Sequence, residues 1–241
     1  VMPNITAPSK RDILKNMGAE LHLVDAKPYN DPGNYQKVSK RLAKEIEKNK
    51  NIKTFWAGQF DNTANYKFHE KTTAQEIYKQ TDGSINGFTC AIGTGGTLTG
   101  VSVGLKNINK DIKIACTDSQ GSSMYNYFVN GNLEKKGNES ITEGIGQARI
   151  TKNLENCSVD MSYFVNDYEC MEILYKLIKT EGLFLGTSSG VNIMGAIKMA
   201  KEMGPGKKIV TILCDDANKY FDKMFNKEFL ISKGLPIPDW I

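Results

Sequence analysis

Residues 93–100, Gly-Thr-Gly-Gly-Thr-Leu-Thr-Gly, combine three properties that a phosphate site needs. Glycine lets the backbone approach an anion closely and adopt positive φ angles. The segment follows an apolar run that ends at Ile92 and precedes residues with helical spacing. Its N–H groups are therefore expected at a helix N-terminus, where the helix dipole favours negative charge. Because Thr94, Thr97 and Thr99 add hydroxyl donors, the loop suits a phosphate monoester.

Two other interpretations of this loop remain open, although a P-loop is excluded because no lysine follows Gly100. One is a dinucleotide-binding fold, since a predicted strand over 112–117 ends at Asp118, about 20 residues beyond the glycines, where such folds place an acidic residue. Against it, the third glycine of that fingerprint falls on Leu98, whose bulk should prevent close helix packing. The other is a turn that only connects a strand to a helix.

Length and composition are those of an ordinary globular chain. The 241 residues suffice for one large domain or two modest ones. The net charge is +4, but the densest group of lysines, over residues 37–53, alternates with glutamates at helical spacing. We therefore expect no nucleic-acid partner. No run of residues is long and apolar enough to cross a membrane, so no membrane partner is expected either.

The five cysteines are separated along the chain, and there are only two histidines. Cys90, Cys116 and Cys214 fall in or at the end of apolar runs, where cysteine packs as a small apolar residue. No pair has the spacing of a zinc site, so we expect no metal. Reduced cysteines and the lack of a signal-peptide pattern favour a cytoplasmic protein.

Strand-like and helical segments alternate along the chain, which predicts parallel strands with helices on both faces. The predicted helices cover 9–17, 35–48, 73–80, 100–107, 123–130, 167–181 and 191–203. The predicted strands cover 20–24, 54–57, 87–92, 112–117 and 208–214. A polar stretch over 59–65 follows a predicted strand, so we expect two domains, 1–60 and 61–241.

Three further segments have the composition of binding-site material. Residues 186–190, Gly-Thr-Ser-Ser-Gly, place small hydroxyl side chains before a predicted helix, although these serines could equally be N-caps. Gly144 and Gly146 allow a close backbone approach to a flat ligand, or simply form a turn. Gln59 carries an amide that can both donate and accept hydrogen bonds.

In this order the motifs closely resemble the cysteine synthase (O-acetylserine sulfhydrylase) and cystathionine β-synthase family, pyridoxal-phosphate enzymes of fold type II. The resemblance covers the whole chain and rests on Gln59-Phe60-x-Asn62-x-Ala64-Asn65, His69–Thr73, 93–100, Glu143–Gly146, Gly186–Gly190 and Leu213–Asp215. It implies a tryptophan synthase β-like α/β fold of two domains. Parallel or mostly parallel sheets would be flanked by helices, and the smaller domain would be incomplete.

The resemblance also implies roles for individual residues. Those that would hold the phosphate of pyridoxal 5′-phosphate are Gly93, Thr94, Gly95, Gly96 and Thr97. Ser188 would hydrogen-bond the ring nitrogen, and a neutral hydroxyl there leaves the ring unprotonated and a weaker electron sink. Gln59 would hold the substrate carboxylate, and Gly144 would lie where the ligand approaches.

Two departures from the family pattern are visible. The lysine that forms the Schiff base and a Thr-Ser-Gly-Asn loop both precede the family segment that matches Val1–Pro3. No residue is therefore assigned the Schiff-base role, and we expect the chain to be the larger part of an enzyme without its first third. At Asp215-Asp216-Ala217, relatives commonly have Asp-Ser-Gly, which leaves the substrate open.

The implied activity is β-replacement that forms L-cysteine from O-acetylserine and sulfide. One alternative is a condensation of serine with homocysteine, as in cystathionine β-synthase. Another is a catalytically inactive binding module, because the Schiff-base lysine is absent from this chain. The implied partners are small-molecule substrates, a second copy in a homodimer and the C-terminal tail of serine acetyltransferase.

Overall fold

The computed structural model describes residues 1–6 and 8–241, and the chain divides into two compact units, Val1–Gly58 and Gln59–Ile241. The division lies slightly before the boundary expected between residues 60 and 61. The reason is that the Asn153 side chain donates to the carbonyl oxygens of Gln59 and Phe60 at 2.9 and 2.8 Å. These two residues are thereby held in the larger unit.

The smaller unit contains a two-stranded parallel sheet and two helices. They are β1 (Met2–Pro3), α1 (Pro8–Asn16), β2 (Leu23–Val24) and α2 (Tyr35–Lys50). Among the described residues of this unit, only Asn34 is buried. A two-stranded sheet with so little core is marginal in water, so this unit needs further packing partners for stability.

Two predicted strands of the smaller unit are changed in the structure. The strand predicted over 20–24 is limited to Leu23–Val24. The strand predicted over 54–57 is wrong, since this segment is irregular. Its Thr54 hydroxyl instead donates to the carbonyl oxygen of Ala43 on α2 at 3.0 Å, so the segment is held by a helix rather than by a strand.

The larger unit is built on a four-stranded parallel sheet with the strand order β5–β4–β3–β6. The strands are β3 (Gly87–Cys90), β4 (Lys113–Ser119), β5 (Met161–Val165) and β6 (Ile209–Val210). The predicted α/β fold with parallel strands flanked by helices is confirmed. β5 was missed in the sequence; it lies at the sheet edge, and four of its five residues are only partly buried.

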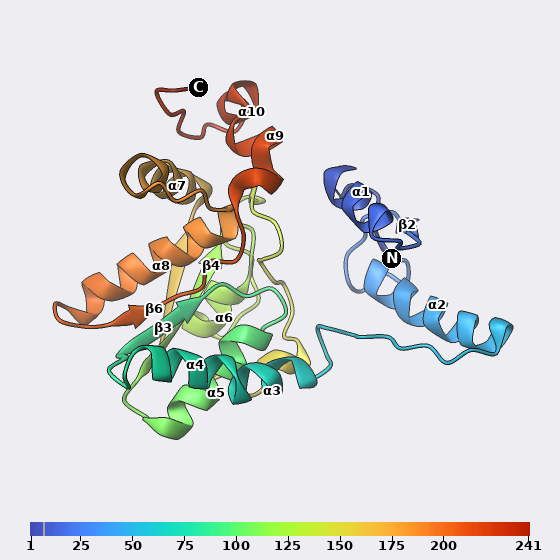
Figure 1. Ribbon diagram of the computed structural model, residues 1–241, viewed down its shortest axis with the longest axis horizontal. Coiled ribbons are helices and arrows are strands. Elements are labelled where there is room, and N and C mark those ends of the chain that lie inside the picture. Colours follow the sequence, from blue (N-terminus) through green and yellow to red (C-terminus); the bar gives the residue numbers. More distant parts are fainter. Residues whose placement is uncertain (7) are drawn as a thin grey trace. The chain divides into compact units, whose positions relative to one another are not determined.

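Helices cover both faces of this sheet (Figure 1). They are α3 (Ala64–Lys71), α4 (Thr73–Gln80), α5 (Gly96–Ile108), α6 (Met124–Asn130), α7 (Asp167–Glu181), α8 (Thr187–Met203), α9 (Phe221–Met224) and α10 (Lys227–Ser232). Figure 1 shows α3, α4 and α5 on one side of the sheet and α7 and α8 on the other. One apolar core lies under α4 and α5, and a second joins α7, α8 and the C-terminal segment.

Glycines let α3 lie directly on α5. Gly96, Gly100 and Gly104 recur every four residues and so share one face of α5. A Cβ atom at Gly100 would overlap the carbonyl oxygen of Tyr66 and lie 2.8 Å from the backbone nitrogen of Glu70. A side chain at this position would therefore push α3 away, and α3 carries the residues that contact the glycine loop.

Gly100→Ala tests this packing, because the sign of the change in the free energy of unfolding depends on the contact with α3. Alanine is favoured over glycine in a helix by roughly 1 kcal/mol, so a helix without the contact would be stabilised. We expect the overlap to prevail and the free energy of unfolding to fall by about 1–3 kcal/mol in urea denaturation. Asn107→Ala, on the exposed part of the same helix, is the control and should change little. A more stable Gly100→Ala variant would contradict the packing described.

Candidate functional site

The strand order of the large sheet indicates where along its carboxyl edge a ligand would bind. The chain order runs β3, β4, β5 to one side, and β6 then returns to the other side of β3. Ligands of open α/β sheets bind at such a reversal, beyond the carboxyl ends of the strands. The loop 93–96 follows β3, and Leu213–Asp215 follow β6, so two of the motifs meet at this point.

The glycine loop forms the N-terminal turn of α5. Gly95 is the N-cap with φ of +88°, and no side chain caps this helix. The helical bonding begins with Thr99 N–H donating to Gly95 O at 3.0 Å. The N–H groups of Thr97 and Leu98 therefore have no carbonyl partner within the helix. They lie at the positive end of the helix dipole, which suits an anion.

The carbonyl oxygens of the loop are held by side chains from a distant segment. Gln147 Nε2 donates to Gly93 O at 3.1 Å, and Thr151 Oγ1 donates to Thr94 O at 2.7 Å. A carbonyl oxygen bonded in this way is directed at its donor, so it does not repel an anion on the N–H side. Sequence reasoning missed both residues, because neither stands in a recognisable motif.

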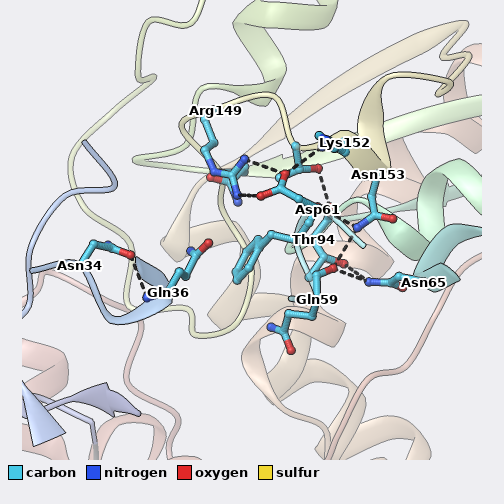
Figure 2. Close-up of polar contacts among 12 residues, drawn as sticks. Asn34, Gln36, Gln59, Asp61, Asn65, Thr94, Arg149, Lys152 and Asn153 are labelled. Atoms are coloured by element: carbon cyan, nitrogen blue, oxygen red, sulfur yellow. Dashed lines mark hydrogen bonds and ion pairs between the residues drawn. The ribbon is translucent and has the colours of Figure 1, made fainter. Parts of the chain in front are cut away.

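The three threonines of residues 93–100 have different surroundings, and Thr99 is fully buried within α5. Thr94 Oγ1 accepts from Asn65 Nδ2 at 3.0 Å and from the N–H of Gly96 at 3.2 Å (Figure 2). Thr97 Oγ1 lies 3.4 Å from His69 Nε2, whose other ring nitrogen lies 2.9 Å from Thr73 Oγ1. Burial lowers the pKa of His69, which favours a neutral imidazole beside Thr97.

The structure brings the predicted residue Gly144 onto the glycine loop. A Cβ atom at Gly93 would lie 2.5 Å from the carbonyl oxygen of Gly144, so only glycine permits this contact. The N–H of Gly146 donates to Ile92 O at 2.9 Å and fixes the approach. Glu143 is paired with Lys223 at 2.7 Å, which ties the same segment to α9.

Ser188 lies in the first turn of α8, where it is 4% exposed. The N-cap of α8 is Gly186 and no side chain caps the helix, so the interpretation of these serines as N-caps is wrong. Ser189 Oγ accepts from the N–H of Cys214 at 2.9 Å, which joins this turn to the segment after β6. Burial raises the pKa of Cys214, and a hydrogen bond to Ser188 offsets part of that effect.

A single side chain links α8 to the strand that carries the glycine loop. Asn192 Oδ1 accepts from the N–H of Ala91 at 2.7 Å, and its Nδ2 donates to Ile212 O at 2.8 Å. Ser188 lies one turn before Asn192 on the same helix, and Ala91 lies two residues before Gly93. The structure thus brings the start of α8 and the glycine loop to the same edge of the sheet.

Gln59 is held by its backbone and leaves its side chain exposed. Its carbonyl oxygen accepts from Asn65 Nδ2 and Asn153 Nδ2, each at 2.9 Å. In Figure 2 its side-chain amide points away from the Asp61–Arg149 pair. Asn65 therefore bonds both Gln59 and Thr94, which connects these two predicted site residues.

An ion pair fixes the segment that contains Gln59. Arg149 Nη1 and Nη2 donate to the two oxygens of Asp61 at 3.0 and 2.9 Å (Figure 2). The N–H of Lys152 also donates to Asp61 at 3.1 Å. Burial alone would raise the pKa of the Asp61 carboxyl, but these hydrogen bonds outweigh it, so the pKa is lowered.

Asp118 had left a dinucleotide site open and Asp216 had left the substrate open, and both residues have structural roles. Asp118 is 1% exposed, and its Oδ2 accepts from the N–H of Tyr125 at 2.7 Å, so it holds the start of α6. Burial raises its pKa to about 6. A buried carboxylate is not available for a ribose, which counts against a dinucleotide site. Asp216 accepts from the N–H of Asn218 at 2.9 Å and caps a short 3-10 helix.

The residues of the glycine loop fit a phosphate group. Gly93, Gly95 and Gly96 are packed so closely that a Cβ atom on them would overlap Gly144, Leu154 and Asn65, respectively. The N–H groups that begin α5 and the threonine hydroxyls are hydrogen-bond donors, which match the acceptor oxygens of a phosphate. No carboxylate belongs to residues 93–100, so no negative charge of the loop opposes the phosphate.

Comparison with known proteins identifies the class. Residues 1–215 match the family described as pyridoxal-phosphate dependent enzymes, and the chain belongs to this family. Its cofactor is therefore pyridoxal phosphate. In the part of the chain that the structure describes, no helix is long and apolar enough to cross a membrane.

Among curated proteins, the chain is similar to cysteine synthases. The chain is 40% identical to "Cysteine synthase 1" of Emericella nidulans, over 97% of this chain and 63% of the relative. It is also 40% identical to "Cysteine synthase 1" of Neurospora crassa, over 97% of this chain and 62% of the relative. The resemblance to cysteine synthases is confirmed, and the chain spans a little less than two thirds of these relatives.

A solved structure agrees with this result. An O-acetylserine dependent cystathionine β-synthase from Helicobacter pylori superposes with a TM-score of 0.77 at 28% identity. The match covers 92% of this chain and 67% of that chain. The chain is therefore similar both to cysteine synthases and to a cystathionine β-synthase.

Asp61→Asn tests the ion pair through its pH dependence. Because the folded-state pKa of Asp61 is lowered, its contribution to stability is full above the unfolded value of about 3.9 and is lost as the pH falls through the folded value. At neutral pH we expect the variant to lose about 1–2 kcal/mol, between the values for exposed and buried pairs. The loss, measured by urea denaturation from pH 7 to pH 3, should shrink on acidification. Asp111→Asn, in an exposed turn, is the control. A loss that is the same at both ends of this range would contradict the lowered pKa.

Proposed function

We propose that this chain forms the cofactor-binding part of a cysteine synthase, an enzyme that makes L-cysteine from O-acetylserine and sulfide. The observation that carries the proposal is the glycine loop at the start of α5, with its carbonyl oxygens bonded to Gln147 and Thr151 and its N–H side left for an anion. The similarity to two fungal cysteine synthases supports the substrate class.

Each predicted residue has a task in this proposal. Pyridoxal phosphate, when bound, supplies the electron sink for loss of a substituent from the β-carbon of an amino acid. Residues 93–97 hold its phosphate and so orient the ring. Ser188 bonds the ring nitrogen through a neutral hydroxyl, which leaves that nitrogen without a full positive charge. The Gln59 amide binds the substrate carboxylate, and Gly144 lies where the ligand approaches. No lysine of this chain is assigned the covalent role.

A second candidate function concerns the nucleophile. The similarity to the Helicobacter pylori enzyme, named an O-acetylserine dependent cystathionine β-synthase, favours a chemistry in which a larger thiol replaces sulfide. Rates with sulfide and with homocysteine in the intact protein separate the two functions. A faster reaction with homocysteine would overturn the cysteine synthase proposal. The inactive-module alternative would be supported if the intact protein binds the cofactor and turns over neither nucleophile.

The same resemblance leads us to propose protein partners and a cellular location. We expect a homodimer that also binds the C-terminal tail of a serine acetyltransferase, as implied for the family. We also expect a reducing, cytoplasmic location, because the buried thiols of Cys90, Cys116 and Cys170 are free. Sedimentation, a pull-down with the tail peptide and cell fractionation test these three points.

Replacing both threonine hydroxyls tests the phosphate site. A hydrogen bond to a charged group contributes roughly 1.5–3 kcal/mol, so Thr94→Ala with Thr97→Ala should weaken cofactor binding at least tenfold. The measurement is a fluorescence titration with pyridoxal 5′-phosphate. Thr180→Ala, on the exposed part of α7, is the control. Unchanged cofactor affinity in the double variant would count against the phosphate site.

Ser188→Ala tests the proposed hydrogen bond to the ring nitrogen of the cofactor. Because Ser188 is assigned to the ring nitrogen and not to the phosphate, we expect the cofactor affinity to change by less than about threefold. The 15N chemical shift of the labelled pyridine nitrogen should move, since it loses a hydrogen-bond partner. A large loss of phosphate-dependent affinity would show that the role given to Ser188 is wrong.

A further inference from the structure

Asn65 occupies the start of α3 and touches the glycine loop directly. Its Nδ2 donates to Gln59 O at 2.9 Å and to Thr94 Oγ1 at 3.0 Å (Figure 2). An amide NH2 group has two hydrogens, so both are engaged. A Cβ atom at Gly96 would overlap the Asn65 side chain, which therefore lies against the first turn of α5.

This contact determines the direction of the Thr94 hydroxyl. A hydroxyl has two acceptor lone pairs and one hydrogen. At Thr94 the two lone pairs are occupied by Asn65 Nδ2 and by the N–H of Gly96, at 3.0 and 3.2 Å. The hydrogen of Thr94 must then be donated to a third group. A phosphate has only acceptors to offer at its dianionic oxygens, so this hydroxyl is prepared for it.

We infer that Asn65 is a positioning residue that makes the Thr94 hydroxyl an obligate donor to the cofactor phosphate. The inference rests on the proposed phosphate site in residues 93–97. Asn65 does not touch the anion and acts through Thr94. Without Asn65, the Thr94 hydroxyl can rotate to other acceptors, and part of the phosphate affinity is lost.

The surrounding contacts hold Asn65 in place for this role. The Arg149–Asp61 pair and the bonds from Asn153 fix the segment that precedes α3. The N–H of Asn65 itself donates to the carbonyl oxygen of Asn62 at 3.1 Å. The side-chain amide of Asn65 is therefore held against Thr94, because the segment that precedes α3 is itself fixed by these bonds.

The experiment is a double-mutant cycle in the full chain, with Asn65→Leu and Thr94→Val. The measured quantity is the ratio of the dissociation constants for pyridoxal and pyridoxal 5′-phosphate, because pyridoxal lacks only the phosphate. Each single variant should lower this ratio by about tenfold. The double variant should lose no more than about twice as much as Thr94→Val alone, since the two residues act through one hydroxyl. Thr94→Ser, which keeps the hydroxyl, should remain sensitive to Asn65→Leu.

Two controls separate this role from a general loss of structure. Asn156→Leu removes an exposed amide of the same unit, which bonds Tyr66 at 3.2 Å, and should leave the ratio unchanged. Asn65→Asp replaces the donor by an acceptor that can take the Thr94 hydrogen. If Asn65→Leu does not fold, Asn65→Asp must show the same loss and the same dependence on Thr94.

The outcomes distinguish this inference from the proposed function. If the unmodified chain binds pyridoxal as tightly as pyridoxal 5′-phosphate, the proposed phosphate site itself is wrong. If the unmodified chain prefers the phosphate but Asn65→Leu retains the full preference, only the inference is overturned. It is also overturned if the losses of the two single variants multiply in the double variant, because Asn65 would then act independently of Thr94.

Discussion

The site depends on which way the backbone dipoles of one short loop point. A peptide loop binds an anion only when its N–H groups face the ligand and its carbonyl oxygens are bonded elsewhere. Here the carbonyl oxygens of Gly93 and Thr94 are taken by Gln147 and Thr151. The N–H groups at the start of α5 are left on the other side. A phosphate can then bind without rearrangement of the loop, which lowers the free-energy cost of binding.

The remaining architecture supplies the partners that this orientation requires. The reversal of chain order at β3 places the loop beside the segment that follows β6, and Asn192 ties α8 to both. On the opposite face, Gly100 and Gly104 let α3 lie directly on α5. α3 begins at the residue before Asn65, whose amide reaches Thr94. Packing of two helices is thereby linked to the hydrogen bonding of one hydroxyl in the site.

The sequence predicted the local features well and the distant contacts poorly. The α4 and α7 helices were predicted with their observed bounds because apolar periodicity is a local signal. α3 was missed because its eight residues contain no continuous apolar stripe. The bond from Gln147 to Gly93 joins residues 54 positions apart, and that from Asn153 to Gln59 joins residues 94 apart. No spacing rule reports such pairs, so the supports of the loop were visible only in the structure.

The most direct measurement of the central claim is two-dimensional 15N–1H NMR of the full chain during a titration with pyridoxal 5′-phosphate and, separately, with pyridoxal. A phosphate bonded by backbone N–H groups should move the amide resonances of Thr97 and Leu98 downfield. Pyridoxal, which has no phosphate, should leave these two resonances in place. If both compounds shifted them equally, or if the phosphate shifted only residues outside the glycine loop, the account of this site would be contradicted.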